Sequence, residues 1–332
     1  MVNYASIMYE PAGIFSMSET TQQSNSTATA ELQLLYSTSV EPDQIDQLGH
    51  MNVRFYGVHA LAGARELIDR LGMPSMTDAD GARAAFTDLY TRHYLEQLEG
   101  APLEVWGGVL EVRESEVQTY YELRNPVRDE IGATFVFTVQ YQNGETHKAL
   151  PLSQAVSSAA NSMLIHWPEH GKPRSVSLDS TPSVLSLEDV HTLNIESRDV
   201  RVISPADCDA NSVYRIDSFQ DLVWGSEGIS EDKDWRRNRE NGEKMGWATM
   251  ESRCTLIELP RAGTRVQSFR ATVDISRKAQ HERFWVFDID RSVLLCTASF
   301  VDVAFNINTR SAIEIPAFER DRMAENYRPE LA

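Results

Sequence analysis

The chain lacks the features that would place it in a membrane or outside the cell. Of its 332 residues only three are cysteines, Cys208, Cys254 and Cys296, and they form no CxxC or Cys/His cluster. Such scattered cysteines are typical of neither a disulfide framework nor a zinc site. No apolar run approaches the roughly 18 residues that a membrane helix needs, and residues 1–30 contain no Lys or Arg to begin a secretory signal. We therefore expect a cytoplasmic protein that does not enter a membrane.

Basic charge is also scarce. The chain has 31 Lys and Arg against 49 Asp and Glu, which gives a formal net charge of −18. Counterion release rewards a basic surface, so this balance argues against nucleic acid as a partner. Hydrophobic residues at 42% and charged residues at 24% are ordinary values, and they predict a folded globular protein.

The chain divides into a tail, two domains and a linker. Residues 1–30 end in a polar run with too little apolar surface to become ordered, which predicts a flexible tail. A Pro- and Ser-containing stretch within 166–195 has no sustained period and predicts a linker. The remaining segments, 31–165 and 196–332, are each long enough for one domain.

The two domain-sized segments resemble each other at a constant spacing. VEPDQID ends at Asp46 and VISPADCD ends at Asp209, and we call the step from Asp46 to Asp209 the repeat offset. The same offset pairs Pro42 with Pro205, Gly100 with Gly263, Asp88 with Glu251 and Thr134 with Thr297. We interpret the segments as two copies of one domain.

Periodicity predicts the same order of elements in both copies. Apolar side chains at helical spacing predict one long amphipathic helix over 55–71, and Gly72 ends it. Runs rich in β-branched and aromatic residues follow at 86–98, 103–112, 117–123 and 133–141, and again at 247–258, 265–275, 283–289 and 293–305. Since no helix separates these strands, the sheet should be antiparallel and the fold class α+β.

The most specific motif lies directly before the predicted helix. Asp46, Gly49, His50 and Asn52 follow the order D-x-x-G-H-x-N. This motif, followed by an aromatic residue and a helix, resembles the signature of the hot-dog thioesterases, the 4-hydroxybenzoyl-CoA thioesterase-like and acyl carrier protein thioesterase families. The resemblance covers both copies and is sharpest over residues 40–72. It implies two tandem hot-dog domains, each a curved antiparallel sheet wrapped around a long helix, paired within one chain with acyl thioester sites at the seam.

The resemblance implies hydrolysis of an acyl-CoA or acyl carrier protein thioester without a metal or redox cofactor. The reaction needs a group that activates water or attacks the carbonyl, and donors where oxyanion charge develops. Asp46 can serve as base or nucleophile, while backbone N–H groups at the helix start, approachable at Gly49, can bind the thioester oxygen. His50 and Asn52 are candidates to orient the carboxylate or the water. The structural alternative is a helix N-cap, for which Asp and Asn are favoured residues, with His50 only filling a turn.

The second copy departs from this pattern. Asp209 is retained and Asn211 follows it, but Val213 stands where the first copy has His50. Plant-type acyl carrier protein thioesterases resemble D-x-N-x-H-x-N at this place, so the pattern is divided between the copies. We favour the first copy as catalytic and keep Asp209 and Asn211 as candidates.

Three further residues are weaker candidates. Glu251 shares a repeat position with Asp88, and some hot-dog thioesterases resemble this in using a second carboxylate near the facing helix; the alternative is an exposed acidic residue at a strand end. Arg236 and Arg237 belong to a basic run that we interpret as an insertion of the second copy. Arginines suit the phosphates of coenzyme A, and the alternative is a solvated loop balanced by acidic neighbours.

Two other functions stay open at this stage. A hot-dog hydratase or dehydratase would use a histidine on the substrate carbon, usually in a His-Phe-Pro-Gly-like or Asp-x-x-x-x-His loop, and the sequence has neither. A non-catalytic acyl-CoA-binding protein is suggested by the degenerate second copy. A homodimer of double hot-dog chains is a further open question.

Overall fold

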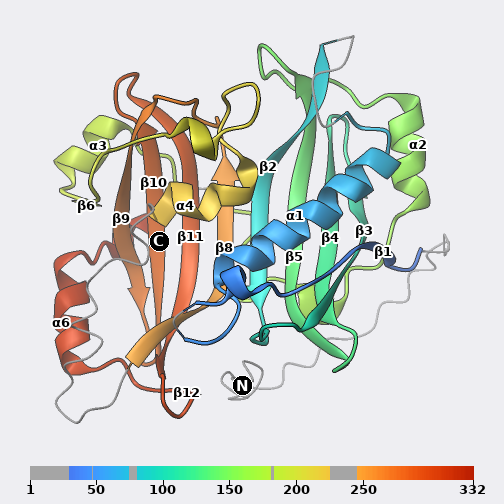
Figure 1. Cartoon of the computed structure of the whole chain (residues 1–332). Coiled ribbons are helices and arrows are strands. Elements are labelled where there is room, and N and C mark those ends of the chain that lie inside the picture. Colours follow the sequence, from blue (N-terminus) through green and yellow to red (C-terminus); the bar gives the residue numbers. More distant parts are fainter. Residues whose placement is uncertain (1–29, 47, 75–80, 181–182, 225–244) are drawn as a thin grey trace, which may run out of the picture.

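The structure, a computed structural model, describes residues 30–46, 48–74, 81–180, 183–224 and 245–332 (Figure 1). The predicted tail, except Ala30, and the candidates Arg236 and Arg237 lie outside the described residues. The described strands form a 12-stranded sheet in the order β1-β3-β4-β5-β2-β8-β11-β10-β9-β6, with β7 on β9 and β12 on β11. Their pairings are antiparallel, as the sequence predicts.

The first copy supplies one half of this sheet and its long helix. The strands are β1 (Gln33–Ser39), β2 (Ala82–His93), β3 (Pro102–Val112), β4 (Glu116–Asn125) and β5 (Glu130–Asn143). The short helix η2 (Pro42–Gln44) precedes α1 (Val53–Arg70), and α2 (Gln154–Ser162) follows β5. α1 ends where Gly72 adopts a left-handed φ of 74°, as its position after the last apolar residue predicts.

The second copy repeats these elements at the repeat offset. The strands β8 (Met245–Leu256), β9 (Arg265–Ile275), β10 (Ala279–Asp288) and β11 (Val293–Asn306) begin and end one offset after β2, β3, β4 and β5. The same holds for η4 (Pro205–Asp207) and α6 (Ala317–Glu325), while the short strands β6 (Glu196–Ser197) and β7 (Arg201–Val202) replace β1. As many residues separate Asp209 from β8 as separate Asp46 from β2. The interpretation of an insertion before β8 is therefore wrong.

Shorter elements complete the second half. η5 (Ile216–Ser218) and α4 (Phe219–Trp224) stand at the sequence position of the start of α1. η3 (Glu169–Gly171) and α3 (Leu187–Thr192) lie in the connecting segment 166–195, and β12 (Ser311–Ala312) and η6 (Pro329–Leu331) lie near the C-terminus. Among the described helices, none is long and apolar enough to cross a bilayer.

β2 and β8 lie side by side at the middle of the sheet and join the two halves (Figure 1). Their register runs from Asp88 opposite Thr255 to Arg92 opposite Glu251. By the repeat offset, Glu251 is the counterpart of Asp88 and Thr255 is the counterpart of Arg92, so the two end pairs are equivalent. The register therefore places an approximate twofold axis between Tyr90 and Arg253. The predicted pairing of two hot-dog domains into one continuous sheet is confirmed.

The two faces of the sheet have different covers. α1 and α4 lie on one face over a shared apolar core, and ion pairs join Arg65 of α1 to Asp217 (2.7 Å) and Arg54 to Asp221 (3.3 Å). The connecting segment covers the other face. Because side chains alternate along a strand, Leu89 of β2 packs in the core under α1, whereas its neighbour Tyr90 packs in a cluster under the connecting segment.

Candidate functional site

The loop before α1 has the same backbone course in both copies. The N–H of Asp46 donates to the carbonyl of His50 (3.0 Å), and the N–H of Gly49 donates to the carbonyl of Asp46 (3.0 Å). The second copy repeats both hydrogen bonds one offset further along, at 2.8 Å and 3.0 Å. Gly49 and its counterpart Ser212 both have a left-handed φ, of 82° and 61°. The copies therefore differ here in side chains rather than in backbone.

Asn52, not Asp46, caps α1. Its Oδ1 accepts the N–H of Arg54 at 3.1 Å. Oδ1 of Asp46 instead accepts the N–H of Leu48 at 2.8 Å and so closes the turn before the helix. The structural alternative in which Asp46 caps the helix is thus excluded by the geometry, and Oδ2 of Asp46 is left for other contacts.

Asp46 and His50 line a cavity of about 120 Å³ at the seam between the two halves. Asn52 also lines it, with Tyr56 of α1. The second copy supplies the facing wall, through Trp247 and Thr249 of β8 and Phe305 of β11. Neither copy alone would enclose this space.

A line of ionisable side chains runs beside the cavity. Nδ1 of His50 lies 3.8 Å from Oδ2 of Asp46, and its Nε2 lies 3.3 Å from Oε1 of Glu96. Oε2 of Glu96 receives a hydrogen bond from the Arg310 guanidinium at 2.7 Å. The side chains of Asp46, His50 and Glu96 are only 11%, 13% and 4% exposed, so little water screens them from one another. Arg310 follows β11, so the second copy completes the line.

Sequence reasoning missed Glu96 and Arg310. Glu96 falls inside the predicted strand 86–98, but β2 ends at His93 and Glu96 lies in the following loop. The sequence offers one signal for these two residues, which is that each differs from its counterpart in the other copy. Leu259 stands at the position of Glu96, and His147 stands at the position of Arg310.

β2 contributes a second imidazole to the cavity. His93 is 5% exposed and packs edge-on against Tyr56, with ring centroids 5.1 Å apart. Its Nε2 has no hydrogen-bond partner among the described residues. Burial lowers the pKa of His93 to about 4, so the ring is neutral at pH 7. Its Nε2 is available to a bound molecule.

The second copy offers a poorer version of the site. Asp209 and Asn211 are exposed, and Oδ1 of Asp209 accepts the N–H groups of Asn211 (2.8 Å) and Val213 (3.0 Å). Val213 and Leu259 stand where the first copy has His50 and Glu96. Asp209 therefore has neither of the two ionisable neighbours that the offset would place beside it.

Glu251 is not brought to either aspartate. Glu251 lies under the connecting segment, where its carboxylate accepts the N–H groups of Arg174 (2.9 Å), Ser175 (2.7 Å) and Val176 (2.8 Å). It is buried rather than exposed, and it holds the connecting segment on the sheet. The N–H of Gly49 is committed within its own turn. In the described part of the chain, no group of three or more His, Cys, Asp or Glu side chains is arranged to hold a metal ion.

The architecture is that of a double hot-dog protein. Similar solved structures include an acyl-ACP thioesterase from Bacteroides thetaiotaomicron, at 12% identity over 82% of this chain and 97% of that chain, with a TM-score of 0.61. The 12:0-ACP thioesterase from Umbellularia californica is similar at 10% identity over 81% of this chain and 93% of that chain, with a TM-score of 0.60. No protein-family model and no curated protein matches the sequence. The predicted resemblance to hot-dog thioesterases is confirmed at the level of the fold.

Proposed function

We propose that the chain hydrolyses acyl thioesters of coenzyme A or acyl carrier protein in the seam cavity beside Asp46. The observation that carries this proposal is the line from Asp46 through His50 to Glu96, completed by Arg310 from the other copy. Two similar structures are named as acyl-ACP thioesterases, which supports the same reaction class.

The chemistry follows from the order of these groups. Glu96 holds the imidazole of His50 through Nε2, 3.3 Å away, and Arg310 balances the charge of Glu96. Nδ1 of His50 then lies 3.2 Å from the carbonyl of Met51 and 3.8 Å from Oδ2 of Asp46. In one route, Oδ2 of Asp46 removes a proton from water, the resulting hydroxide adds to the thioester carbonyl carbon, and the C–S bond breaks. The proton taken by Asp46 then passes by way of His50 to the departing thiolate. In the other route, Oδ2 attacks the carbonyl carbon and expels the thiolate, and a water molecule hydrolyses the resulting acyl anhydride, releasing the acid and restoring Asp46.

The start of α1 supplies the oxyanion donor. The N–H groups of Asn52, Arg54 and Phe55 are taken by the carbonyl of Gln44, by Oδ1 of Asn52 and by the carbonyl of Asn52. Val53 lines the cavity. In the first turn of α1, its N–H is the donor that has no hydrogen-bond partner among the described residues. The positive end of the helix dipole favours negative charge at the same point.

Thiol release from a panel of acyl thioesters tests the proposal. Short, branched, aromatic and long acyl-CoAs, and the matching acyl carrier protein thioesters, should include at least one substrate with enzyme-dependent release. Interconversion of enoyl- and 3-hydroxyacyl-CoAs without thiol loss would favour the hydratase alternative instead. Tight acyl-CoA binding with no turnover of any panel member would favour a binding protein.

The proposal also covers the domain bounds, the location of the enzyme and the roles of Asn52 and Glu251. We assign the two domains to residues 31–165 and 196–332, joined by 166–195, and place the enzyme in the cytoplasm. Asn52 acts as a helix cap and Glu251 as an anchor of the connecting segment. Size-exclusion chromatography with light scattering distinguishes a single double hot-dog chain from a homodimer.

A further inference from the structure

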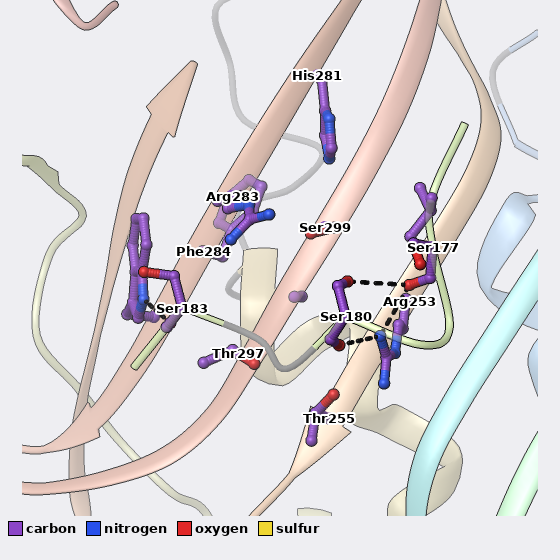
Figure 2. A pocket seen from close by; sticks show the side chains of 13 residues that line it. Ser177, Ser180, Ser183, Arg253, Thr255, His281, Arg283, Phe284, Thr297 and Ser299 are labelled. Carbon is purple, nitrogen blue, oxygen red and sulfur yellow. Dashed lines mark hydrogen bonds between the residues drawn. The ribbon is translucent and has the colours of Figure 1, made fainter. Parts of the chain in front are cut away.

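The face of the sheet under the connecting segment holds a second polar pocket in the second copy (Figure 2). Its floor is one row across three strands, in which Arg283 of β10 pairs with Ser299 of β11, and Ser299 pairs with Arg253 of β8. With strands ~4.8 Å apart, the two arginines flank the serine at roughly 10 Å between their backbones. The rest of the lining includes Ser177, Ser180, Ser183, Thr255, His281 and Thr297, around a space of about 40 Å³.

The two arginines of this row are in different states. Nε of Arg253 lies 3.0 Å from both carboxylate oxygens of Asp88, and its Nη1 donates to the carbonyls of Ser177 (2.8 Å) and Ser180 (2.9 Å). Arg283 has no hydrogen bond or ion pair with any described residue, and its Nε is buried. Burial, and then repulsion from Arg253, lower the pKa of Arg283. An arginine nevertheless keeps its proton, so its charge calls for a counter-ion.

A second group in the pocket also lacks a partner. Nε2 of His281, two residues before Arg283 on β10, is buried and has no hydrogen bond to a described residue. Figure 2 shows His281, Arg283 and Ser299 along one stretch of the sheet, with Ser180 and Ser183 of the connecting segment beside it. Buried polar groups are normally hydrogen-bonded, and one small polar group bound in this pocket would satisfy both His281 and Arg283.

The first copy shows the same place in a packed form. At the repeat offset, Tyr120, Val136 and Tyr90 replace Arg283, Ser299 and Arg253. All three belong to one apolar cluster under the connecting segment. At these three positions the fold has two tyrosines and a valine in one copy and two cations and a hydroxyl group in the other. Support of the connecting segment does not require the charged form.

We propose that this pocket binds a small oxyanion, a phosphate or sulfate group, with Arg283 as its main charged ligand. Guanidinium and hydroxyl donors suit the oxygens of such a group. His281 and Ser299 would contribute from the sheet, and the serines of the connecting segment from above. The bound group would tie that segment to β10 and β11, on the face opposite α1. The proposal is independent of the thioesterase assignment.

Calorimetric titration of the full chain with inorganic phosphate tests the proposal, with sodium chloride at equal ionic strength as the blank. Adenosine 3′,5′-bisphosphate, titrated separately, presents the phosphate as part of a larger molecule. We expect one binding event per chain and a raised melting temperature. Arg283→Gln should weaken binding about tenfold or more, because it removes a charged hydrogen-bond donor.

Two further variants make the test decisive. Ser299→Val copies Val136 of the first copy, so it should fold normally while closing the pocket and abolishing binding. Arg265→Gln removes the same charge from an exposed side chain on β9 that pairs with Asp290 (2.8 Å), and it should leave binding unchanged. Binding of the bisphosphate alone, lost in Ser299→Val, would support the proposal and assign the group to a larger ligand. If wild type binds neither probe, or if folded Arg283→Gln or Ser299→Val binds as well as wild type, the proposal is overturned.

Discussion

The two copies share a backbone but differ in where two groups of ionisable side chains lie. In the first copy one such group lies at the loop before α1, where Asp46, His50 and Glu96 meet. In the second copy Val213 and Leu259 stand in place of the imidazole and the glutamate. The sheet face under the helices shows the reverse, since Glu282 and Asp302 are buried where the first copy has Thr119 and Val139.

This division teaches how a repeated fold can keep one site. The seam cavity uses walls from both copies, so the second copy contributes Arg310 and Trp247 although Asp209 has no ionisable neighbours at the positions of His50 and Glu96. Because the offset is constant from β2 to β5, the two copies differ in these side chains without a change of architecture. Variants in each copy test whether catalysis depends on the ionisable side chains of the first copy alone.

The largest expected effect comes from Asp46→Asn. Asn keeps the shape and the hydrogen bond from Leu48 but removes the charge, so turnover should fall by about 10²–10⁴, the usual contribution of a positioned acid–base group. Asp209→Asn is the matched control and should retain most of the turnover. The measurement is kcat for both variants on one acyl thioester. Loss of activity in Asp209→Asn with retention in Asp46→Asn would move the chemistry to the second copy.

A smaller fall in kcat should follow when the ion pair between Arg310 and Glu96, which crosses the seam between the copies, is broken. Arg310→Gln leaves Glu96 without its guanidinium partner, and Glu96→Gln weakens the hold on His50. Each should lower kcat roughly 10–100-fold, the scale of one hydrogen bond to a charged group. The double variant should cost little more than either single variant, because the two side chains act as one unit. Full additivity would contradict the link.

Two buried groups, one in each copy, should respond to pH in opposite ways. Burial lowers the pKa of His59 in the first copy to about 4, whereas an unfolded histidine titrates near 6.5. Between these values the unfolded state binds more protons, so stability is present above pH 6.5 and is lost as the pH falls toward 4. His59→Gln should reduce this slope, which is at most about 1.4 kcal/mol per pH unit for one group. Urea unfolding at pH 4–7 measures it.

Glu282 should give the opposite slope in the second copy. Burial, and then Asp302, raise its pKa to about 7 against the pull of Arg270, from an unfolded value of 4.5. The folded state then holds the extra proton, so this contribution to stability is present below pH 4.5 and is lost as the pH rises toward 7. Glu282→Gln should flatten that loss. An unchanged pH profile in this variant would show that Glu282 is ionised in the fold.

The smallest effect concerns Asn52. Asn52→Ala should lower the free energy of unfolding by about 1 kcal/mol through loss of the cap, with little change in kcat, and Asn52→Asp should restore the stability. Arg215 occupies this position in the second copy, so no equivalent cap exists there to compensate. A hundredfold fall in kcat at unchanged stability would instead assign Asn52 to the chemistry.

The sequence by itself determined the repeat, the order of elements and the loop that carries Asp46. The constant offset, the helical period over 55–71 and the β-rich runs are local patterns, and the structure has α1 and each predicted strand at those places. Hydrophobic spacing reports which elements form because burial of one face acts within a single element. The motif at Asp46 and His50 was visible for the same reason, since its residues are near neighbours in the chain.

Only the tertiary structure decided which distant side chains meet and which face each strand residue occupies. Glu96 and Arg310 are 214 residues apart, and the pairing of β2 with β8 brings their copies together. Glu251 was expected near the helix, but an irregularity in β8 between Thr249 and Glu251 interrupts the alternation along the strand. Because a shift of one residue moves a side chain to the other face, no pattern in the sequence could place it.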